Sequence, residues 1–433
     1  MKELNLTKIK KVHFIGIGGI GLSAIARMML EEGKSVSGSD QSASIITDEL
    51  KKLGAEISIG HDSKNVPANC DMVVYTAALS EDNPELLEAK KRNTLTLTYF
   101  EALGWISRDK YTIAISGTHG KTTTTAMIGK IMIDAGLEPT VVIGSLIKNG
   151  NCRSNFIHGN SKYFLVEADE YKKSFHSLNP RILVITNIDE DHLDFYKDLA
   201  DIQNSFAELA KKVPQDGFLI VNKLNPNLSP VLKEAKCNII DYSSITVPKL
   251  KVPGEHNRMN ARAALAVARA LNVNGDKAKK SLEDFEGAWR RFEYKGRLKN
   301  GAMIYDDYAH NPEKIKSALN GARECFGKKR IIAVFQPHLY SRTKHFLSRL
   351  AGSFNEADSI LIAPIYAARE KPDSSINSDI LKDEVLKSGK MTISFRDFAG
   401  IENYLKDNTQ DGDIIMTMGA GDIYKVGENL LKK

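Results

Sequence analysis

Residues 111–122 read YTIAISGTHGKT, an apolar run followed by two glycines, a lysine and a threonine. The run Tyr111–Ser116 predicts a buried strand, and residues 123–135 predict a helix. A glycine turn between a strand and a helix lets backbone N–H groups and the helix N-terminus face phosphate oxygens. The stretch therefore predicts a wound α/β unit that binds a nucleotide.

This turn departs from the strict phosphate-loop pattern, which requires glycine where Ile115 stands. The chemistry is retained, because Lys121 still supplies a positive charge and the Thr122 hydroxyl can bind Mg²⁺. We therefore predict that ATP binds at this turn. The predicted contacts are Gly117, Thr118, His119, Gly120, Lys121, Thr122 and Thr123.

Two later strands end in residues that can bind a metal ion. Glu167 closes the predicted strand 163–167, and His192 follows the predicted strand 182–186. Ligands gather at the carboxyl ends of parallel strands, so both side chains are expected beside the phosphates. Without the turn, a histidine among acids would indicate a solvated ion pair. Together with the turn, it predicts a metal site made by Thr122, Glu167 and His192.

A second glycine turn lies upstream, where Gly16, Gly18 and Gly21 separate a predicted strand from a predicted helix. Asp40 follows at the end of the next strand, in the position that can accept a ribose hydroxyl. The pattern predicts a diphosphate nucleotide and leaves an NAD-dependent dehydrogenase open. Lysines before the apolar run resemble a signal peptide. The glycines, and the strand and acidic residue that follow, favour the nucleotide turn.

The length of 433 residues predicts about three domains. Later apolar runs at 303–306, 331–335, 359–362 and 414–418 predict a third α/β sheet. We place the domains at residues 1–103, 104–294 and 295–433.

The composition narrows the class of protein. Apolar residues make up 42% and charged residues 26%, as in globular proteins, and no apolar stretch approaches the roughly 20 residues of a membrane span. The net charge of +6 comes without a basic run, which argues against nucleic-acid binding. The four cysteines form no CxxC pair, which argues against a disulfide framework or a zinc site and fits a reducing, cytoplasmic location.

An ordered set of motifs carries a family resemblance. The motifs are HFIGIGG at 13–19, GTHGKTTT at 117–124, EADE at 167–170, TNI at 186–188 with DH at 191–192, GEHN at 254–257, RRFE at 290–293, DDYAH at 306–310, QPH at 336–338 and GAGD at 419–422. In this order they resemble the muramyl ligase family over nearly the whole chain.

The resemblance implies an α/β fold with three domains. These are a Rossmann-like UDP-binding domain, a central P-loop ATPase-type α/β domain, and a C-terminal Rossmann-like α/β domain that presents the amino acid. The implied UDP-sugar contacts are Gly16, Gly18, Gly19, Gly21, Asp40 and Thr76. The further implied ATP contacts are Asn257, Asn260, Arg290, Arg291 and Asp307. Implied amino-acid contacts are Tyr308, His310 and Arg342, and the implied catalytic residues are Lys121, Glu167, His192 and His310.

The implied reaction starts when the lactyl carboxylate of UDP-N-acetylmuramate attacks the γ-phosphate of ATP. The amine of L-alanine then attacks the acyl phosphate, and positioning and charge neutralisation carry most of the catalysis. Two Mg²⁺ ions are implied, one held by Thr122 and Glu167 and one by Glu167 and His192, with Mn²⁺ as an alternative. The implied partners are small molecules only, with no nucleic acid and no membrane, for a monomer or weak homodimer.

Three departures from the family pattern bear on the substrate. Residues 203–210 contain no lysine, whereas ligases that add later residues use a carbamylated lysine there, which favours the alanine-adding branch. Asn311 stands where many members have a second histidine, and Leu339 replaces a basic residue. Amino-acid selectivity therefore stays open, as do a ligase for a recycled peptide and a nucleotide-binding regulator without turnover.

Overall fold

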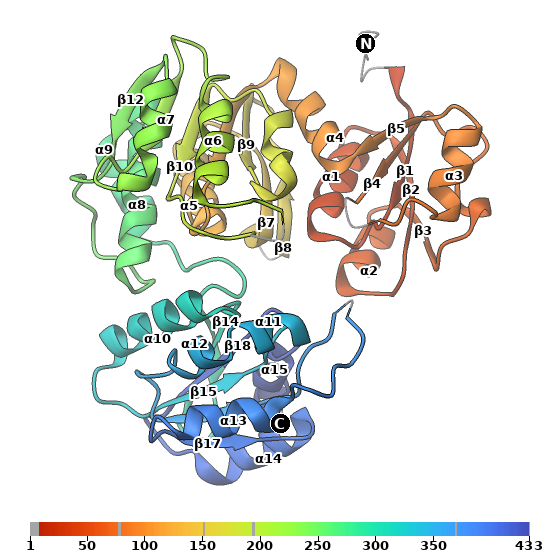
Figure 1. Cartoon of the computed structure of the whole chain (residues 1–433). Coiled ribbons are helices and arrows are strands. Elements are labelled where there is room, and N and C mark those ends of the chain that lie inside the picture. The colour runs from red at the N-terminus through yellow and green to blue at the C-terminus, as the bar shows by residue number, and fades with distance from the viewer. Residues whose placement is uncertain (1–7, 77–78, 150–151, 193–194, 369, 433) are drawn as a thin grey trace. The chain divides into compact units, whose positions relative to one another are not determined.

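The computed structural model describes residues 8–76, 79–149, 152–192, 195–368 and 370–432 (Figure 1). The chain forms two compact units. The first comprises Met1–Lys249 with Met259–Asp284, and the second comprises Leu250–Arg258 with Phe285–Lys433. The first unit contains two β-sheets and the second contains one.

The first sheet is entirely parallel, in the order β3-β2-β1-β4-β5. Its strands are β1 (Lys11–Ile15), β2 (Ser35–Asp40), β3 (Glu56–Ile59), β4 (Met72–Tyr75) and β5 (Leu95–Thr98). Its helices are α1 (Ile20–Glu31), α2 (Ile45–Lys52), α3 (Pro84–Lys91) and α4 (Tyr99–Ile106). Side chains alternate between the faces along each strand, so Phe14 packs with the α1 core while Ile15 packs with Leu86 of α3.

The second sheet has the order β12-β11-β10-β6-β9-β7-β8, and it is parallel apart from the antiparallel hairpin β7–β8. Its strands are β6 (Tyr111–Ser116), β7 (Thr140–Asn149), β8 (Cys152–Ile157), β9 (Tyr163–Glu167), β10 (Ile182–Ile185), β11 (Phe218–Val221) and β12 (Asn238–Asp241). Its helices are α5 (Lys121–Asp134), α6 (Leu199–Ala210), α7 (Ser229–Glu234) and α9 (Gly275–Glu283). Helix α8 (Glu255–Ala270) has residues in both units. Short 3₁₀ helices occupy Ser63–Asn65, Ser107–Asp109, Tyr171–Ser177 and Pro226–Leu228.

The two sheets of the first unit share one hydrophobic core. Helix α1 packs against β7 and β8, and buried Asn155 of β8 donates hydrogen bonds to the carbonyl of Ile20 and, at 2.8 Å, to the hydroxyl of Ser23. The first turn of α1, which follows the upstream glycine turn, is thereby tied to the central sheet.

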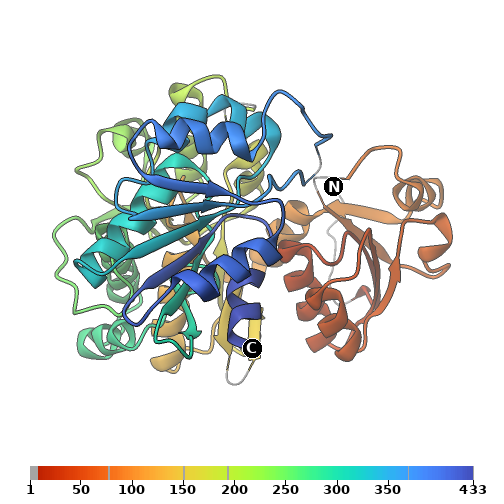
Figure 2. The ribbon, with the colours of Figure 1, turned by 90° about the horizontal axis from the view of Figure 1, so that it is seen from below.

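The sheet of the second unit has the order β13-β14-β18-β15-β16-β17, and Figure 2 shows helices on both of its faces. Its strands are β13 (Glu293–Arg297), β14 (Met303–Asp307), β15 (Ile331–Phe335), β16 (Ser359–Ile362), β17 (Met391–Ser394) and β18 (Ile414–Met418). Its helices are α10 (Pro312–Phe326), α11 (Tyr340–His345), α12 (Leu347–Ala351), α13 (Ser378–Leu386), α14 (Phe398–Asn408) and α15 (Tyr424–Lys432). Each face carries its own buried apolar cluster.

These three sheets confirm the predicted fold class. The proposed boundary at 294/295 falls inside β13, which pairs with β14, so the third sheet begins two residues earlier, at Glu293. Among the described residues, no helix is long and apolar enough to cross a bilayer.

Candidate functional site

The central glycine turn joins β6 to α5, and its two glycines have backbone angles that other residues rarely adopt. Gly117 has φ +126°, and a Cβ added there would lie 2.2 Å from the Thr186 hydroxyl. Gly120 has φ +83°, and a Cβ there would lie 2.4 Å from the amide oxygen of Asn260. Glycine is therefore required at both positions for the turn to pack this closely against its neighbours.

Thr186 and Asn187, which follow β10, brace this turn. The Asn187 carboxamide accepts a hydrogen bond from the His119 N–H at 2.9 Å and donates one to the His119 carbonyl at 3.1 Å. The Asn187 carbonyl accepts from the Thr118 N–H at 3.2 Å. In the sequence, Thr186 and Asn187 stand out only as part of a family motif, although polar residues directly after a buried strand are themselves a signal for a site.

Lys121 begins α5 and is held in place by three acceptors. Its ammonium donates to the Gly117 carbonyl at 2.7 Å and to the two carboxylate oxygens of Glu170 at 2.8 and 3.0 Å. Burial opposes its charge, but Glu170 and Asp169 outweigh burial and raise the pKa of Lys121. Lys121 is therefore a fixed cation directly at the turn.

Thr122 and Glu167, two residues of the predicted metal site, lie side by side. The Thr122 hydroxyl donates to one carboxylate oxygen of Glu167 at 2.9 Å, and the Gly144 N–H donates to the other at 2.8 Å. Hydroxyl and carboxylate oxygens are the donors that Mg²⁺ prefers.

His192 is placed beside different acids from the one predicted. Its Nε2 lies 3.7 Å from a Glu170 oxygen, and Asp169, Glu170 and His192 each offer a ligand atom within 4.8 Å of the others. The imidazole also packs against the Tyr171 ring, with centroids 4.8 Å apart. The donors at this edge are mostly oxygens, which fit Mg²⁺ or Mn²⁺. The structure pairs Thr122 with Glu167, while His192 groups with Asp169 and Glu170.

The upstream glycine turn joins β1 to α1 at the carboxyl edge of the first sheet. Gly16 has φ +85°, and a Cβ there would lie 2.9 Å from the Thr76 methyl group. The N–H of Gly18 donates to the Asp40 carboxylate at 2.9 Å. Gly19 precedes the first residue of α1. The structure therefore brings these five predicted UDP-sugar contacts to one edge of the sheet, with Asp40 bound to the turn itself.

Gly21 is the second residue of α1 and lies under an aromatic ring. A Cβ there would approach the Tyr99 ring to 2.7 Å. Burial raises the pKa of the Tyr99 hydroxyl, with smaller contributions from Glu167 and Asp169. The charges of Glu167 and Asp169 thus act on Tyr99, which lies in none of the motifs quoted above.

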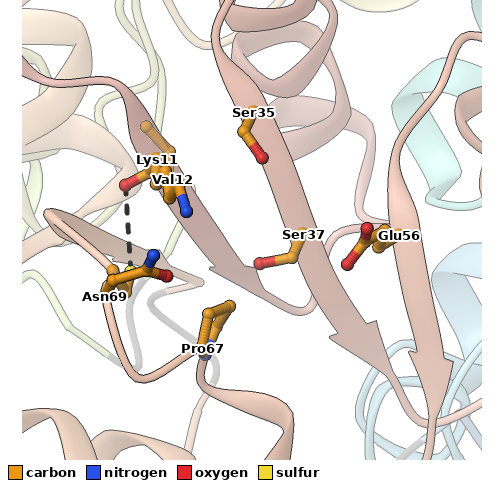
Figure 3. Close-up of a pocket in the computed structure, with 8 residues that line it drawn as sticks. Lys11, Val12, Ser35, Ser37, Glu56, Pro67 and Asn69 are labelled. Carbon is orange, nitrogen blue, oxygen red and sulfur yellow. Dashed lines mark hydrogen bonds between the residues drawn. The ribbon is translucent and has the colours of Figure 1, made fainter.

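A small cavity of about 150 Å³ lies at the opposite edge of the first sheet. Figure 3 shows Ser35 and Ser37 of β2 and Glu56 of β3 around it, with Lys11 of β1. These residues are at or near the amino ends of their strands, so the cavity does not belong to the glycine turn.

In the second unit, Arg290 is buried and each of its guanidinium nitrogens has a partner. Nε donates to Asp306 at 2.8 Å, Nη1 to the Gly421 carbonyl at 2.8 Å and Nη2 to the Gly419 carbonyl at 2.5 Å. Arg290 thus joins β14 to the loop after β18, and its contact with ATP stays a prediction. Arg291 is partly exposed and lies over the Tyr308 ring, 5.3 Å from its centroid.

Asp307 ends β14 and orders the residues around it. Its carboxylate accepts hydrogen bonds from the backbone N–H groups of Phe292 and Ala309, both at 2.8 Å. Burial raises its pKa, against the opposing effect of Arg291.

The predicted amino-acid contacts meet at the carboxyl ends of β14 and β15. The His310 Nδ1 lies 2.8 Å from the Tyr308 carbonyl, which can only accept, so Nδ1 carries the proton. Burial lowers the pKa of His310 well below its usual value, which leaves Nε2 as an unprotonated acceptor. His338, which stands out in the sequence only as part of a motif, lies between His310 and Arg342. Its ring centroid is 5.8 Å from that of His310, and its Nδ1 is 3.1 Å from Nη1 of Arg342.

The two asparagines of α8 fall in different units. Asn260 belongs to the first unit, where its amide oxygen lies directly beside Gly120. Asn257 belongs to the second unit and donates to the Pro253 carbonyl at 2.6 Å.

Family models cover most of the chain. Residues 11–111 match the Mur ligase family, catalytic domain, residues 115–246 match the Mur ligase middle domain, and residues 290–421 match the Mur ligase, glutamate ligase domain.

Similar proteins extend this match to the full length. The chain is 45% identical to a UDP-N-acetylmuramate–L-alanine ligase of Clostridium novyi, over 98% of this chain and 97% of that protein. It is 43% identical to the protein of that name from Clostridium tetani, over 99% of each. The crystal structure of the UDP-N-acetylmuramate-alanine ligase of Thermotoga maritima superposes with a TM-score of 0.83 and 26% identity, over 98% of each chain. The chain therefore belongs to the Mur ligase family.

Proposed function

We propose that this protein ligates L-alanine to the lactyl carboxylate of UDP-N-acetylmuramate, with ATP converted to ADP and phosphate, in peptidoglycan precursor synthesis. The observation that carries the proposal is the central turn, where a fixed cation, Lys121, lies next to the Thr122–Glu167 oxygen pair. The full-length similarity to ligases named for this reaction supports the choice of substrates.

At the central turn, backbone N–H groups and Lys121 would bind the ATP phosphates and neutralise the charge that develops during phosphoryl transfer. Thr122, Glu167 and His192 would hold Mg²⁺, with Asp169 and Glu170 as further oxygen donors. When bound, such an ion polarises phosphoryl oxygens. Asn257, Asn260, Arg290, Arg291 and Asp307 complete the proposed ATP contacts.

In the second unit, His310 would act on the amino acid. The hydrogen bond from its Nδ1–H to the Tyr308 carbonyl leaves Nε2 as a neutral acceptor for a proton of the amine. Arg342, beside His338, offers a positive charge suited to an amino-acid carboxylate. Tyr308 would line the same site.

At the upstream turn, Gly16, Gly18, Gly19 and Gly21 would line the site of the UDP diphosphate, which the N-terminus of α1 would bind. Asp40 and Thr76 lie at the same edge. We place the enzyme in the cytoplasm, as a monomer or weak homodimer, and light scattering of the purified protein tests the oligomeric state.

The deciding experiment measures phosphate release with ATP, Mg²⁺ and UDP-N-acetylmuramate, comparing L-alanine, L-serine, glycine and a tripeptide. We expect release with L-alanine, and the other two amino acids measure the selectivity that Leu339 and Asn311 affect. Release with the tripeptide alone would instead identify a recycling ligase. No release with any single amino acid would refute the proposal.

A further inference from the structure

A fully buried carboxylate lies beneath the upstream glycine turn. Glu85, in the first turn of α3, has no exposed surface and accepts four side-chain hydrogen bonds. One oxygen accepts from His13 Nε2 at 2.7 Å and from the Ser39 hydroxyl at 2.8 Å. The other accepts from His61 Nδ1 at 3.0 Å and from the Asn65 amide at 3.2 Å. Residues from three separate segments, β1, β2 and residues 61–65, therefore converge on Glu85.

These contacts assign the protons in the network. An ionised carboxylate only accepts, so His13 donates through Nε2, and its Nδ1 accepts from the Ser37 hydroxyl at 2.8 Å. Burial opposes the charge on Glu85, but the bonds from His13, Ser39 and their neighbours outweigh it and lower the pKa of Glu85. The network reaches the cavity of Figure 3 through Ser37, which lines it.

The network is joined directly to the glycine turn through Ser39. The backbone carbonyl of Ser39 accepts hydrogen bonds from the N–H groups of Gly16 and Ile17, at 2.8 and 2.9 Å. The hydroxyl of the same residue donates to Glu85. A continuous chain of hydrogen bonds therefore connects the Glu85 carboxylate through Ser39 to the turn.

A second link reaches the same edge of the sheet through His61. The neighbouring Gly60 N–H donates to the Asp40 carbonyl at 2.8 Å, and the Asp40 carboxylate accepts from the Gly18 N–H. Glu85 therefore binds residues at the carboxyl ends of two neighbouring strands, Ser39 in β2 and His61 just after β3.

Stability alone does not require such a network. The face of the sheet under α3 is otherwise apolar, with a buried cluster that includes Ile15, Val73 and Leu86. A core filled with packed apolar side chains is commonly as stable as a core that contains buried charged groups. Directional hydrogen bonds, in contrast, specify one geometry.

We propose that Glu85 is a positioning residue for the UDP-sugar, which presets the glycine turn to bind the nucleotide diphosphate. The inference rests on the proposed function, because it assumes that the upstream turn binds UDP. It assigns Glu85 an effect on nucleotide affinity that should be separable from ATP binding and from the chemical step.

The test is Glu85→Gln, which keeps the side-chain shape but replaces one accepting oxygen by an NH₂ group that faces two donors. We expect the Kd for UDP, measured by calorimetry, and the KM for UDP-N-acetylmuramate to rise about tenfold. The kcat and the KM for ATP should stay within about twofold. Ser39→Ala removes one donor and keeps the backbone carbonyl, so it should raise both UDP parameters about threefold.

The matched control is Glu88→Gln on the same helix. Glu88 is partly exposed and accepts a hydrogen bond from Arg92 at 2.7 Å, away from the turn. The Glu88→Gln substitution should leave the affinity for UDP unchanged.

Two results would overturn the inference. One is unchanged UDP affinity in both Glu85→Gln and Ser39→Ala. The other is an equal loss of ATP and UDP affinity, which would mark a general structural role. If the wild-type protein does not bind UDP, the proposed role of the glycine turn is refuted as well. If the wild-type protein binds UDP and both variants bind it equally well, only the positioning role of Glu85 is refuted.

Discussion

The two glycine turns of the first unit have the same local architecture and different surroundings. Both join a buried parallel strand to a helix, and both use glycines at positive φ, at Gly16 in one and at Gly117 and Gly120 in the other. Residues 16–21, GIGGIG, contain no charged side chain, whereas the central turn leads into Lys121. The central turn also faces Glu167 and Glu170, which end or follow the adjacent β9.

This difference separates binding from chemistry. Backbone N–H groups at a helix N-terminus suffice to hold a diphosphate. Transfer of a phosphoryl group requires charge neutralisation in addition. The upstream turn is therefore suited to binding a nucleotide, and the central turn is suited to catalysing phosphoryl transfer from one.

The largest effect is expected from Lys121→Ala. It removes the cation at the central turn, so turnover should fall by at least about 10³-fold while UDP affinity stays unchanged. Phosphate release and UDP calorimetry on the same preparation measure the two effects, with the melting temperature as a control for folding. If Lys121→Ala kept near-normal turnover, the central turn would not differ from the upstream turn in supplying a catalytic charge.

Gly117→Ala and Gly16→Ala should each damage only its own turn. Alanine at 117 would be strained at φ +126° and would meet the Thr186 hydroxyl, and alanine at 16 would meet the Thr76 methyl. We expect a loss of about 1–3 kcal/mol of stability in each variant. ATP affinity should fall in the first and UDP affinity in the second. Urea unfolding and ligand calorimetry test both, and loss of both affinities in either variant would show that the turns are not independent.

A smaller effect is expected from Asn187→Ala. The amide holds His119 from two sides, so its removal should raise the KM for ATP about fivefold to tenfold through loss of loop order. The KM for UDP-N-acetylmuramate provides the internal control. Equal KM values for ATP in the variant and the wild type would show that Asn187 does not brace the turn.

The smallest effect concerns pH. The pKa of Lys121 is raised above its ordinary value of 10.5. Lys121 therefore stays charged and paired with Glu170 at every pH below 10.5. This stabilising pairing is lost only as the pH rises through the pKa of the folded state. We therefore expect ATP affinity at pH 9.5 to stay within about twofold of its value at pH 7.5. A steep loss by pH 9, measured by calorimetry, would contradict a fixed cation.

Strands buried on both faces were predictable from sequence. The predicted bounds of β6, β9, β15, β16 and β18 equal the observed ones, because a parallel strand covered by helices on both sides appears as an apolar run. Edge strands were missed. β13 (EYKGR) and β3 (EISI) mix charged and apolar residues because much of each is exposed, so they carry no such run.

The sequence by itself determined the α/β class, the two glycine turns, and the lysine and carboxylate that follow buried strands, because these depend on local order along the chain. Only the tertiary structure decided which distant groups meet them. It paired His192 with Asp169 and Glu170, committed Arg290 to Asp306 and set Asn187 against His119. It also gathered His13, Ser39 and His61 around Glu85. Such contacts join residues far apart in the chain, and hydrogen-bond geometry rather than residue type selects their partners.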